Sequence, residues 1–223
     1  MQSAILMLAL AAAAQTWDFK TGPKPNVSVA NIDGSITVEG SARGDVAVEA
    51  TIAEGSGWMV DAQANGPDVK VRVCCGPCDA EGNRCRSGKV DFVLKVPEGA
   101  DLKVKSVSAE IRVNGVAGAQ YLTTVSGRVD SAGSASNVDV HSVSGDVRLS
   151  PTQLAETQAN TVSGDVQIKL PARADAKVHL STVSGKLNGQ KIGMGSGDKI
   201  FGNGTVAVRV KTVSGSVDAQ PSP

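Results

Sequence analysis

The sequence predicts an all-β protein: a single-domain β-solenoid of about seven short rungs with a hairpin-rich N-terminal part. Three observations lead to this fold class. A short motif recurs along the chain, polarity inside each copy alternates with a period of two residues, and helix signals are nearly absent. Such repeats indicate a stack of similar units, because one unit alone cannot bury its own apolar face.

The repeated motif is clearest in "HSVSGDVRLS" at residues 141–150. Related copies are "TTVSGRVDS" at 123–131, "NTVSGDVQI" at 160–168, "STVSGKLNG" at 181–189 and "KTVSGSVDA" at 211–219. Two degenerate copies, "NIDGSITV" at 31–38 and "SVSAEIRV" at 106–113, bring the number to seven. From Val107 onward the valine of the motif recurs after 18, 18, 19, 21 and 30 residues, which is typical of stacked rungs with loops attached.

Alternation within each copy predicts two half-buried strands that meet at a corner. Val138 and Val140 share one face, and the phase then shifts by one residue at Ser142. The residues expected on the buried face after the shift are Val143, Gly145, Val147 and Leu149. The residue at the corner is always a hydroxyl or an amide, able to satisfy backbone groups there: Asn31, Ser106, Thr124, Ser142, Thr161, Thr182 and Thr212.

A glycine follows the corner in six of the seven copies, and Ala109 stands at this position in the seventh. The glycine is explained either by a turn that needs positive φ or by a close approach between opposite walls that leaves no room for a side chain. Because alanine tolerates positive φ poorly, Ala109 favours the close approach. Neither explanation involves catalysis.

The chain divides into a signal peptide (1–14), an N-terminal β region with the first rung and a cysteine-containing hairpin loop (15–105), the repeat solenoid (106–219) and a short tail (220–223). "AILMLALAAAA" at 4–14 suits the apolar part of a secretory signal, although no Lys or Arg precedes Lys20. We therefore expect export, to the periplasm or the cell surface. "WDF" at 17–19 is expected to plug the N-terminal end, and "GMGSGDK" at 193–199 to be a flexible excursion.

The composition excludes some classes of partner. The 22 basic and 22 acidic side chains cancel, so no overall field favours nucleic acid. After the signal segment no apolar run is long enough to span a membrane. Aromatic residues make up only 3% of the chain, which predicts a core of thin aliphatic side chains and argues against an aromatic-lined catalytic pocket.

The four cysteines, Cys74, Cys75, Cys78 and Cys85, lie in one loop between two predicted strands. In an exported protein this indicates two disulfides, with structural zinc as the rival and redox activity as a third alternative. Extending the strand phase from both sides puts Cys74 and Cys85 on the solvent face. The pairing Cys74–Cys85 with Cys75–Cys78 is therefore preferred.

"VPEGADLKVKSVSAEIRV" at 96–113, followed by serial copies of "TVSGDV", resembles the bacterial "putative adhesin" family of exported β-solenoids, long catalogued as a domain of unknown function. The resemblance covers roughly residues 25–219. It implies a cell-envelope protein, with some members linked to envelope-stress sensing, and it supplies no catalytic motif to carry over.

Two further kinds of chemistry receive little support from the sequence. His141 and His179 are interpreted as surface residues in different columns of the repeat, and no Gly-x-Ser-x-Gly motif occurs. Asp146 and Asp165 stack about 5 Å apart on adjacent rungs, the separation of a retaining glycosidase. Their column mixes acidic, basic and polar residues, as an exposed wall ordinarily does.

The sequence therefore predicts a non-catalytic exported envelope protein that presents exposed faces for adhesion or for binding an envelope component. The residues expected on the binding face are Ser144, Asp146, Ser163 and Asp165. The expected partner is an envelope protein or a polysaccharide, and no cofactor is expected. The alternatives are a polysaccharide-acting β-solenoid enzyme and a metal or redox module built on the cysteine loop.

Overall fold

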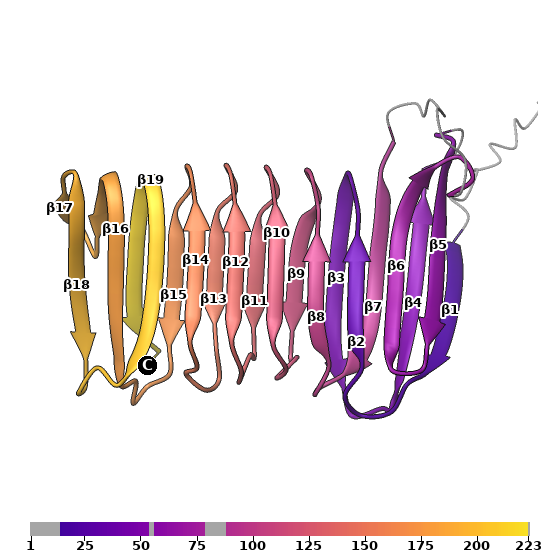
Figure 1. Ribbon diagram of the computed structural model, residues 1–223, viewed down its shortest axis with the longest axis horizontal. Coiled ribbons are helices and arrows are strands. Elements are labelled where there is room, and N and C mark those ends of the chain that lie inside the picture. The colour runs from indigo at the N-terminus through magenta and orange to yellow at the C-terminus, as the bar shows by residue number, and fades with distance from the viewer. Residues whose placement is uncertain (1–13, 54–55, 79–87, 223) are drawn as a thin grey trace, which may run out of the picture.

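The computed structural model describes residues 14–53, 56–78 and 88–222. Nearly all of the expected signal peptide, and Cys85 of the cysteine loop, lie outside these residues. Every regular element in the described part of the chain is a strand, and the strands stack side by side into one elongated body (Figure 1). The all-β solenoid predicted from the sequence is confirmed.

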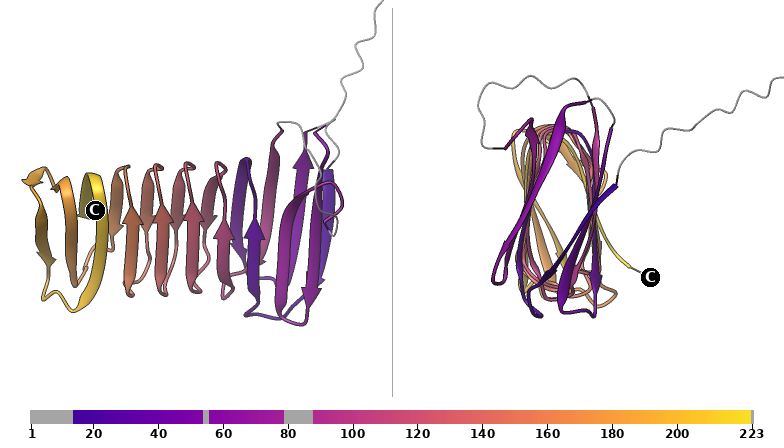
Figure 2. Two further views of the ribbon diagram at one scale, coloured as in Figure 1. Left: turned by 45° about the horizontal axis from the view of Figure 1, so that its top comes forward. Right: turned by 90° about the vertical axis from the view of Figure 1, so that its right-hand side faces the viewer.

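Two walls of strands face each other across the core, as the end-on view in Figure 2 shows. We call them the tyrosine wall and the arginine wall, after Tyr121 and Arg148 on their outer faces. In spatial order the tyrosine wall contains β5 (Trp58–Asn65), β6 (Asp68–Cys75), β2 (Asn26–Ala30), β8 (Asp101–Lys105), β10 (Gln120–Thr124), β12 (Val138–Ser142), β14 (Thr157–Thr161), the first halves of β19 (Val206–Pro221) and β16 (Ala176–Leu187), and β18 (Gly195–Phe201).

The arginine wall has the matching order. It contains β1 (Ala14–Lys20), β4 (Asp45–Ile52), β7 (Val90–Pro97), β3 (Gly34–Ser41), β9 (Glu110–Asn114), β11 (Val129–Ala132), β13 (Val147–Ser150), β15 (Val166–Leu170), the second halves of β19 and β16, and β17 (Gln190–Ile192). Successive rungs pair in parallel, and antiparallel strands occur only near the two ends.

The core is built mainly of valine, leucine, isoleucine and alanine from the inward faces of both walls. Phe92 is the one aromatic side chain that is fully buried among the described residues. A polar bridge also crosses the core, because the Ser131 hydroxyl donates to the Gln120 side-chain oxygen (2.6 Å). The expected core of thin aliphatic side chains is confirmed.

The expected burial of Val143 is wrong, although the phase shift itself is present. Val143 is 46% exposed, whereas Ser142, Gly145 and Val147 are buried. Two successive residues, Val143 and Ser144, turn outward at the corner, so the inward phase resumes three residues after Ser142. The corner thus exposes an apolar side chain in every copy: Ile32, Val107, Val125, Val143, Val162, Val213 and Val183, in spatial order, are 40–51% exposed.

The buried hydroxyl at the corner closes the turn, as the sequence predicts. Ser142 Oγ accepts a hydrogen bond from the Gly145 N–H at 2.9 Å, and Thr124 Oγ1 accepts one from the Gly127 N–H at 3.0 Å. Ser106 does the same for Ala109 at 2.8 Å. These bonds satisfy backbone groups that the turn removes from the ladder.

Both explanations of the glycine column hold: close approach operates throughout it, between neighbouring rungs rather than opposite walls, and positive φ is found at Gly34, Gly164 and Gly215. A Cβ on Gly145 would lie 1.9 Å from the Gly127 carbonyl oxygen, and one on Gly127 would lie 2.0 Å from that of Ala109. Neither glycine has positive φ. The carbonyl of one rung therefore occupies the space that a side chain on the next would need.

At both ends the spatial order of the rungs differs from the chain order. The rung of β2 and β3 lies between that of β6 and β7 and that of β8 and β9. At the other end β19 inserts between β14/β15 and β16. The segment 193–199, expected to be a flexible excursion, instead contributes to β18, which pairs antiparallel with β16 over Ala176–Thr182.

The N-terminal end is wider than the middle. The strands β4 to β7 have 8 residues each, whereas β8 to β15 have 4 or 5. Trp17, Phe19 and Trp58 pack against the core at this end, in agreement with the expected plug. Among the described residues there is no helix that is both long and apolar enough to cross a membrane.

Candidate functional site: a groove on the tyrosine wall

A hollow of about 790 Å³ crosses six strands of the tyrosine wall, from β6 through β2, β8, β10 and β12 to β14. Outward-facing residues such as Ser28 and Tyr121 line it, together with residues whose side chains are buried, such as Val27 and Leu102. The polar and aromatic residues that line it are Asn26, Ser28, Asp68, Lys70, Asp101, Lys103, Gln120, Tyr121, Asn137, Asp139, Glu156 and Gln158. Parallel stacking at about 4.8 Å per strand makes this groove long and straight.

Tyr121 lies near the middle of the groove and is the only tyrosine of the chain. Tyr121 is 37% exposed, and the centroid of the His141 ring on the next strand lies 5.4 Å from that of the Tyr121 ring. Lys103 Nζ lies 6.0 Å from the ring centroid on the other side. His141 Nε2 lies 3.1 Å from Asp139 Oδ1. The groove thus has an aromatic platform held between polar neighbours.

Hydrogen bonds run along the groove from one rung to the next. The Asn26 amide donates to Asp68 Oδ1 at 2.7 Å, and Asp101 Oδ1 accepts from the Ala119 N–H at 2.7 Å. At the far end Glu156 pairs with Arg209. Because these side chains are tied to the stack, the polar lining is pre-organised rather than free to rearrange.

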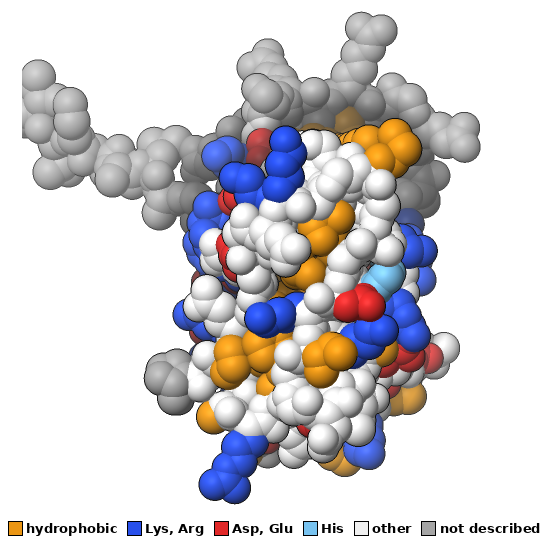
Figure 3. All heavy atoms as spheres, turned by 90° about the vertical axis from the view of Figure 1, so that its left-hand side faces the viewer, with side chains coloured by type: hydrophobic (Ala, Val, Ile, Leu, Met, Phe, Trp, Pro, Cys, Tyr) orange, Lys and Arg blue, Asp and Glu red, His pale blue; other side chains and the backbone are white. Residues whose placement is uncertain are grey.

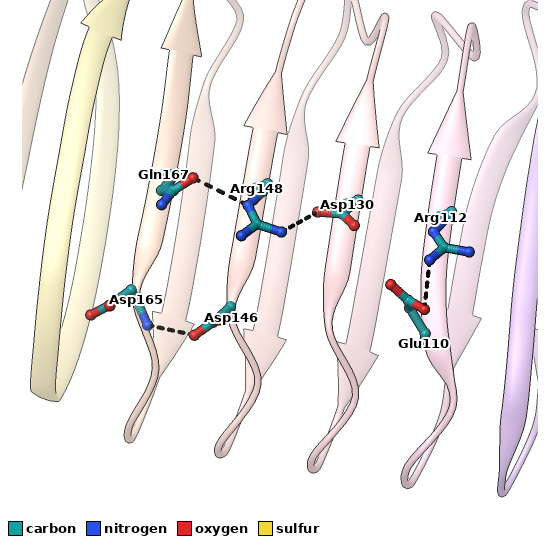
Figure 4. A network of polar contacts seen from close by, with 7 residues as sticks. All are labelled: Glu110, Arg112, Asp130, Asp146, Arg148, Asp165 and Gln167. Atoms are coloured by element: carbon teal, nitrogen blue, oxygen red, sulfur yellow. Dashed lines mark hydrogen bonds and ion pairs between the residues drawn. The ribbon is translucent and has the colours of Figure 1, made fainter.

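The outer face of the arginine wall carries a second polar network (Figure 4). Arg148 Nε donates to Gln167 Oε1 at 3.1 Å, and Arg148 Nη1 lies 3.7 Å from Asp130 Oδ1. One strand further along, Arg112 pairs with Glu110 at 2.8 Å. These side chains are between 30% and 50% exposed, so the pairs lie in high dielectric and contribute little to stability.

The four residues of the predicted binding face lie at the corner and at the start of the arginine wall. Asp146 Oδ1 accepts from the Asp165 N–H at 3.1 Å (Figure 4). Asp165 Oδ1 in turn accepts from the Ser216 N–H at 2.8 Å. The Ser144 hydroxyl donates to the Val125 carbonyl at 3.3 Å, and Ser163 is exposed. The two carboxylates therefore cap backbone groups of the next rung, a structural use that the glycosidase alternative does not require.

The described cysteines lie at the end of β6 and just after it, at the corner between the two walls, the position that Ser144 occupies in its own rung. Cys74 and Cys78 are joined by a disulfide with their Cα atoms 5.1 Å apart, so the preferred pairing of Cys74 with Cys85 is wrong. The strand phase used for that pairing ends where the chain leaves β6, and the turn brings Cys78 back beside Cys74. Cys75 is also disulfide-bonded. Within the described part of the chain, no cluster of His, Cys, Asp and Glu could hold a metal ion.

A comparison with known protein families identifies the family of this chain. The sequence model of the family described as Toastrack DUF4097 matches residues 20–220. The chain belongs to the Toastrack family. Among curated proteins none matches it. The family is not a known enzyme class.

Two solved structures of bacterial proteins are similar to this chain. One is described as a "putative cell adhesion protein" from Clostridium sporogenes, with a TM-score of 0.55 and 10% identity over 94% of this chain and 100% of that chain. Another is described as a "putative adhesin" from Bacteroides fragilis, with a TM-score of 0.42 and 14% identity over 94% and 98%. At these identities the likeness to the Clostridium structure concerns the fold alone.

The sequence did not predict the groove. Tyr121 could have been placed on an outer face, because it alternates with the buried Leu122. Its neighbours in the groove come from residues 26 to 158, and β2 lies between β6 and β8 only because the rungs are reordered. No local pattern carries that information.

Proposed function

We propose that this Toastrack protein is an exported binding scaffold of the cell envelope, and that the groove on the tyrosine wall holds an extended, mostly uncharged polysaccharide. The observation that carries the proposal is the groove itself, six strands long with Tyr121 near its middle. Repeat proteins use such extended surfaces to bind through many modest contacts. Binding, not transformation, is the role that this groove supports.

The chemistry of the lining suits a sugar chain. The exposed ring of Tyr121 offers an apolar face on which the C–H face of a sugar ring can pack, while its hydroxyl stays available for hydrogen bonds. Amides and carboxylates of Asn26, Asn137, Asp139 and Gln158 line the groove as donors and acceptors. A few well-placed polar groups around an apolar surface are typical of ligand sites.

The charges in the groove favour a neutral polymer. Asp68, Asp101, Asp139 and Glu156 line it together with Lys70 and Lys103, so both signs occur and acidic groups outnumber basic ones. A polyanion such as a nucleic acid would meet these carboxylates and be repelled. The lining thus supports the expectation that nucleic acid is not the partner.

A second contact surface remains proposed at Ser144, Asp146, Ser163 and Asp165, where an envelope protein could bind. This surface is weaker support for binding than the groove, because the side chains of Ser144, Asp146 and Asp165 already form hydrogen bonds with backbone groups of neighbouring rungs. Its contribution should be spread over several rungs. Only combined substitutions there should weaken binding, whereas a single change in the groove should already be felt.

The decisive experiment measures binding of purified envelope polysaccharides to the wild-type chain and to Tyr121→Ala. We expect Tyr121→Ala to weaken binding about tenfold or more, because removal of a well-packed aromatic anchor commonly costs more than 1 kcal/mol. Arg148→Ala on the arginine wall is the matched control and should bind like wild type. Equal binding by wild type and Tyr121→Ala would remove the groove from the proposal, and equal loss in both variants would indicate a different surface.

A further inference from the structure

The C-terminal end of the stack carries three polar side chains joined in one hydrogen-bonded series. His179 Nδ1 lies 2.5 Å from Asp198 Oδ1, and Ser181 Oγ lies 3.3 Å from His179 Nε2. The three residues are far from the groove residue Tyr121 in the spatial order of the strands. Figure 3 views this end of the molecule, where basic, acidic and apolar side chains are intermixed at the surface.

The strands explain why these side chains meet. His179 and Ser181 are two residues apart on β16, so their side chains both point outward. Leu180 between them and Val178 before them are buried. β18 returns antiparallel beside β16, and its register places Asp198 opposite His179. The hairpin that caps the stack thus brings a carboxylate to a histidine that already has a hydroxyl beside it.

The arrangement fixes which ring nitrogen carries the proton. An ionised carboxylate can only accept, so His179 Nδ1 donates to Asp198 and Nε2 presents its lone pair to the Ser181 hydroxyl. Hydrogen bonds from His179 and then from Lys177 lower the pKa of Asp198, which keeps this carboxyl ionised at neutral pH. A base between a carboxylate and a serine hydroxyl is the order found in nucleophilic serine sites.

We propose that Ser181 is a nucleophile activated by His179 and Asp198, and that this end of the solenoid cleaves esters of small acyl groups. The site is independent of the proposed groove and reverses the expectation that the chain has no catalytic serine. His179 and Asp198 are about 40% exposed, so no pocket selects a large acyl group. Esters suit such an open site better than amides, because an alkoxide leaves more readily than an amine.

The chemical step is an acyl transfer to and from serine. Ser181 Oγ attacks the carbonyl carbon while His179 Nε2 takes the hydroxyl proton, and the ester C–O bond then breaks as His179 returns that proton to the leaving alkoxide. Water attacks the acyl-Ser181 ester by the same route, giving the carboxylic acid and restoring the serine. On β19 the residue in register with Ser181 is Lys211, whose ammonium can stabilise the developing oxyanion.

Covalent labelling with an alkyl fluorophosphonate tests the nucleophile directly. The Ser181 oxygen forms the bond to phosphorus and fluoride leaves, so intact-mass and peptide mass spectrometry locate the adduct. We expect one adduct per chain, on Ser181, and no adduct in Ser181→Ala. His179→Ala should slow labelling by about 100-fold or more, because general-base catalysis commonly contributes that much. Hydrolysis of p-nitrophenyl acetate should fall in the same variants.

Two controls keep the test sharp. Ser196→Ala removes a hydroxyl directly across from Ser181 on β18 and should label like wild type, as should Ser144→Ala at a corner without a base. Thermal melts of each variant should match wild type, since the substituted side chains are on the surface. The proposal is overturned if Ser181 is not labelled faster than Ser144, or if His179→Ala leaves the labelling rate of Ser181 unchanged.

Discussion

The middle of the stack and its two ends use the same rung but differ in how the chain reaches it. From β8 to β15 each rung follows its neighbour in both sequence and space, and all the pairings are parallel. At the ends a rung is inserted out of order: β2 and β3 beside β6 and β7, and β19 beside β16. Antiparallel strands then finish each end.

This difference shows how the solenoid protects its edges. A rung left at the end would present a full row of unpaired N–H and C=O groups to other chains. Two short strands, β17 and β18, instead pair antiparallel with the two halves of β16. β18 carries Gly195, Gly197, Asp198 and Lys199, and glycines and charged side chains make an edge a poor template for further pairing. The middle is specified by repetition, and the ends by sequences that depart from it.

The largest effect should come from a charge placed in the corrected core column. Val147 is 1% exposed in β13, so Val147→Asp buries an unpaired carboxylate between rungs and should cost about 3 kcal/mol or more of unfolding free energy. Val143→Asp, four residues earlier at the exposed corner, should change it by less than about 0.5 kcal/mol. Denaturant titration of both variants measures the two unfolding free energies. Equal losses would mean that Val143 is buried, as the sequence predicted.

These two valines show what the sequence could and could not predict. Period-two alternation identified the strands, because successive side chains of a strand point to opposite faces. It could not tell whether one or two residues turn outward at the corner, since Val143 looks like a core residue and Ser144 like a surface one. The position of the hydroxyl at Ser142 was predicted correctly because a turn leaves a backbone N–H that needs an acceptor.

The order of the rungs was beyond local pattern for a different reason. The copies at 181–189 and 211–219 are nearly equivalent as strands. The sequence of neither copy therefore indicates which of the two lies beside residues 160–168. Pairing is decided by the whole stack, including the hairpin that fills the last place. For the same reason the sequence predicted that His179 lies on the surface but not that it contacts Asp198, and it did not predict the groove around Tyr121.

A smaller but still large effect is expected in the glycine column of the middle rungs. Gly145→Ala places a Cβ about 1.9 Å from the Gly127 carbonyl oxygen, so the backbones of two rungs must separate. We expect a loss of about 1–3 kcal/mol, as for other overpacked sites. Gly44→Ala, where nothing lies within 4 Å, is the matched control and should be nearly neutral. Thermal unfolding of the pair gives the comparison, and a stable Gly145→Ala would argue against close rung contact.

Removal of the corner hydroxyl should cost somewhat less. Ser142→Ala leaves the buried N–H of Gly145 without the acceptor that now lies 2.9 Å away, for an expected loss of about 1–2 kcal/mol. Ser144→Ala removes an exposed hydroxyl two residues later and should change stability by less than about 0.5 kcal/mol. If chemical denaturation gives the same value for both, the hydroxyl is not what closes the corner.

The smallest effect should be confined to the capping strand and should depend on pH. Hydrogen bonds from His179 and Lys177 lower the folded-state pKa of Asp198, so the unfolded chain binds its proton more readily. The stabilisation is therefore complete above the ordinary carboxyl pKa of about 3.9 and is lost as pH falls further, through the lowered folded-state value. Amide hydrogen exchange, corrected for intrinsic rates, should show β18 losing protection between pH 6 and pH 3 while β12 keeps it. Asp198→Asn should make β18 exchange alike at both values, because the group that titrates is gone. If β12 loses protection to the same extent, acid loosens the whole stack. The titration of Asp198 would then not distinguish the C-terminal end from the middle.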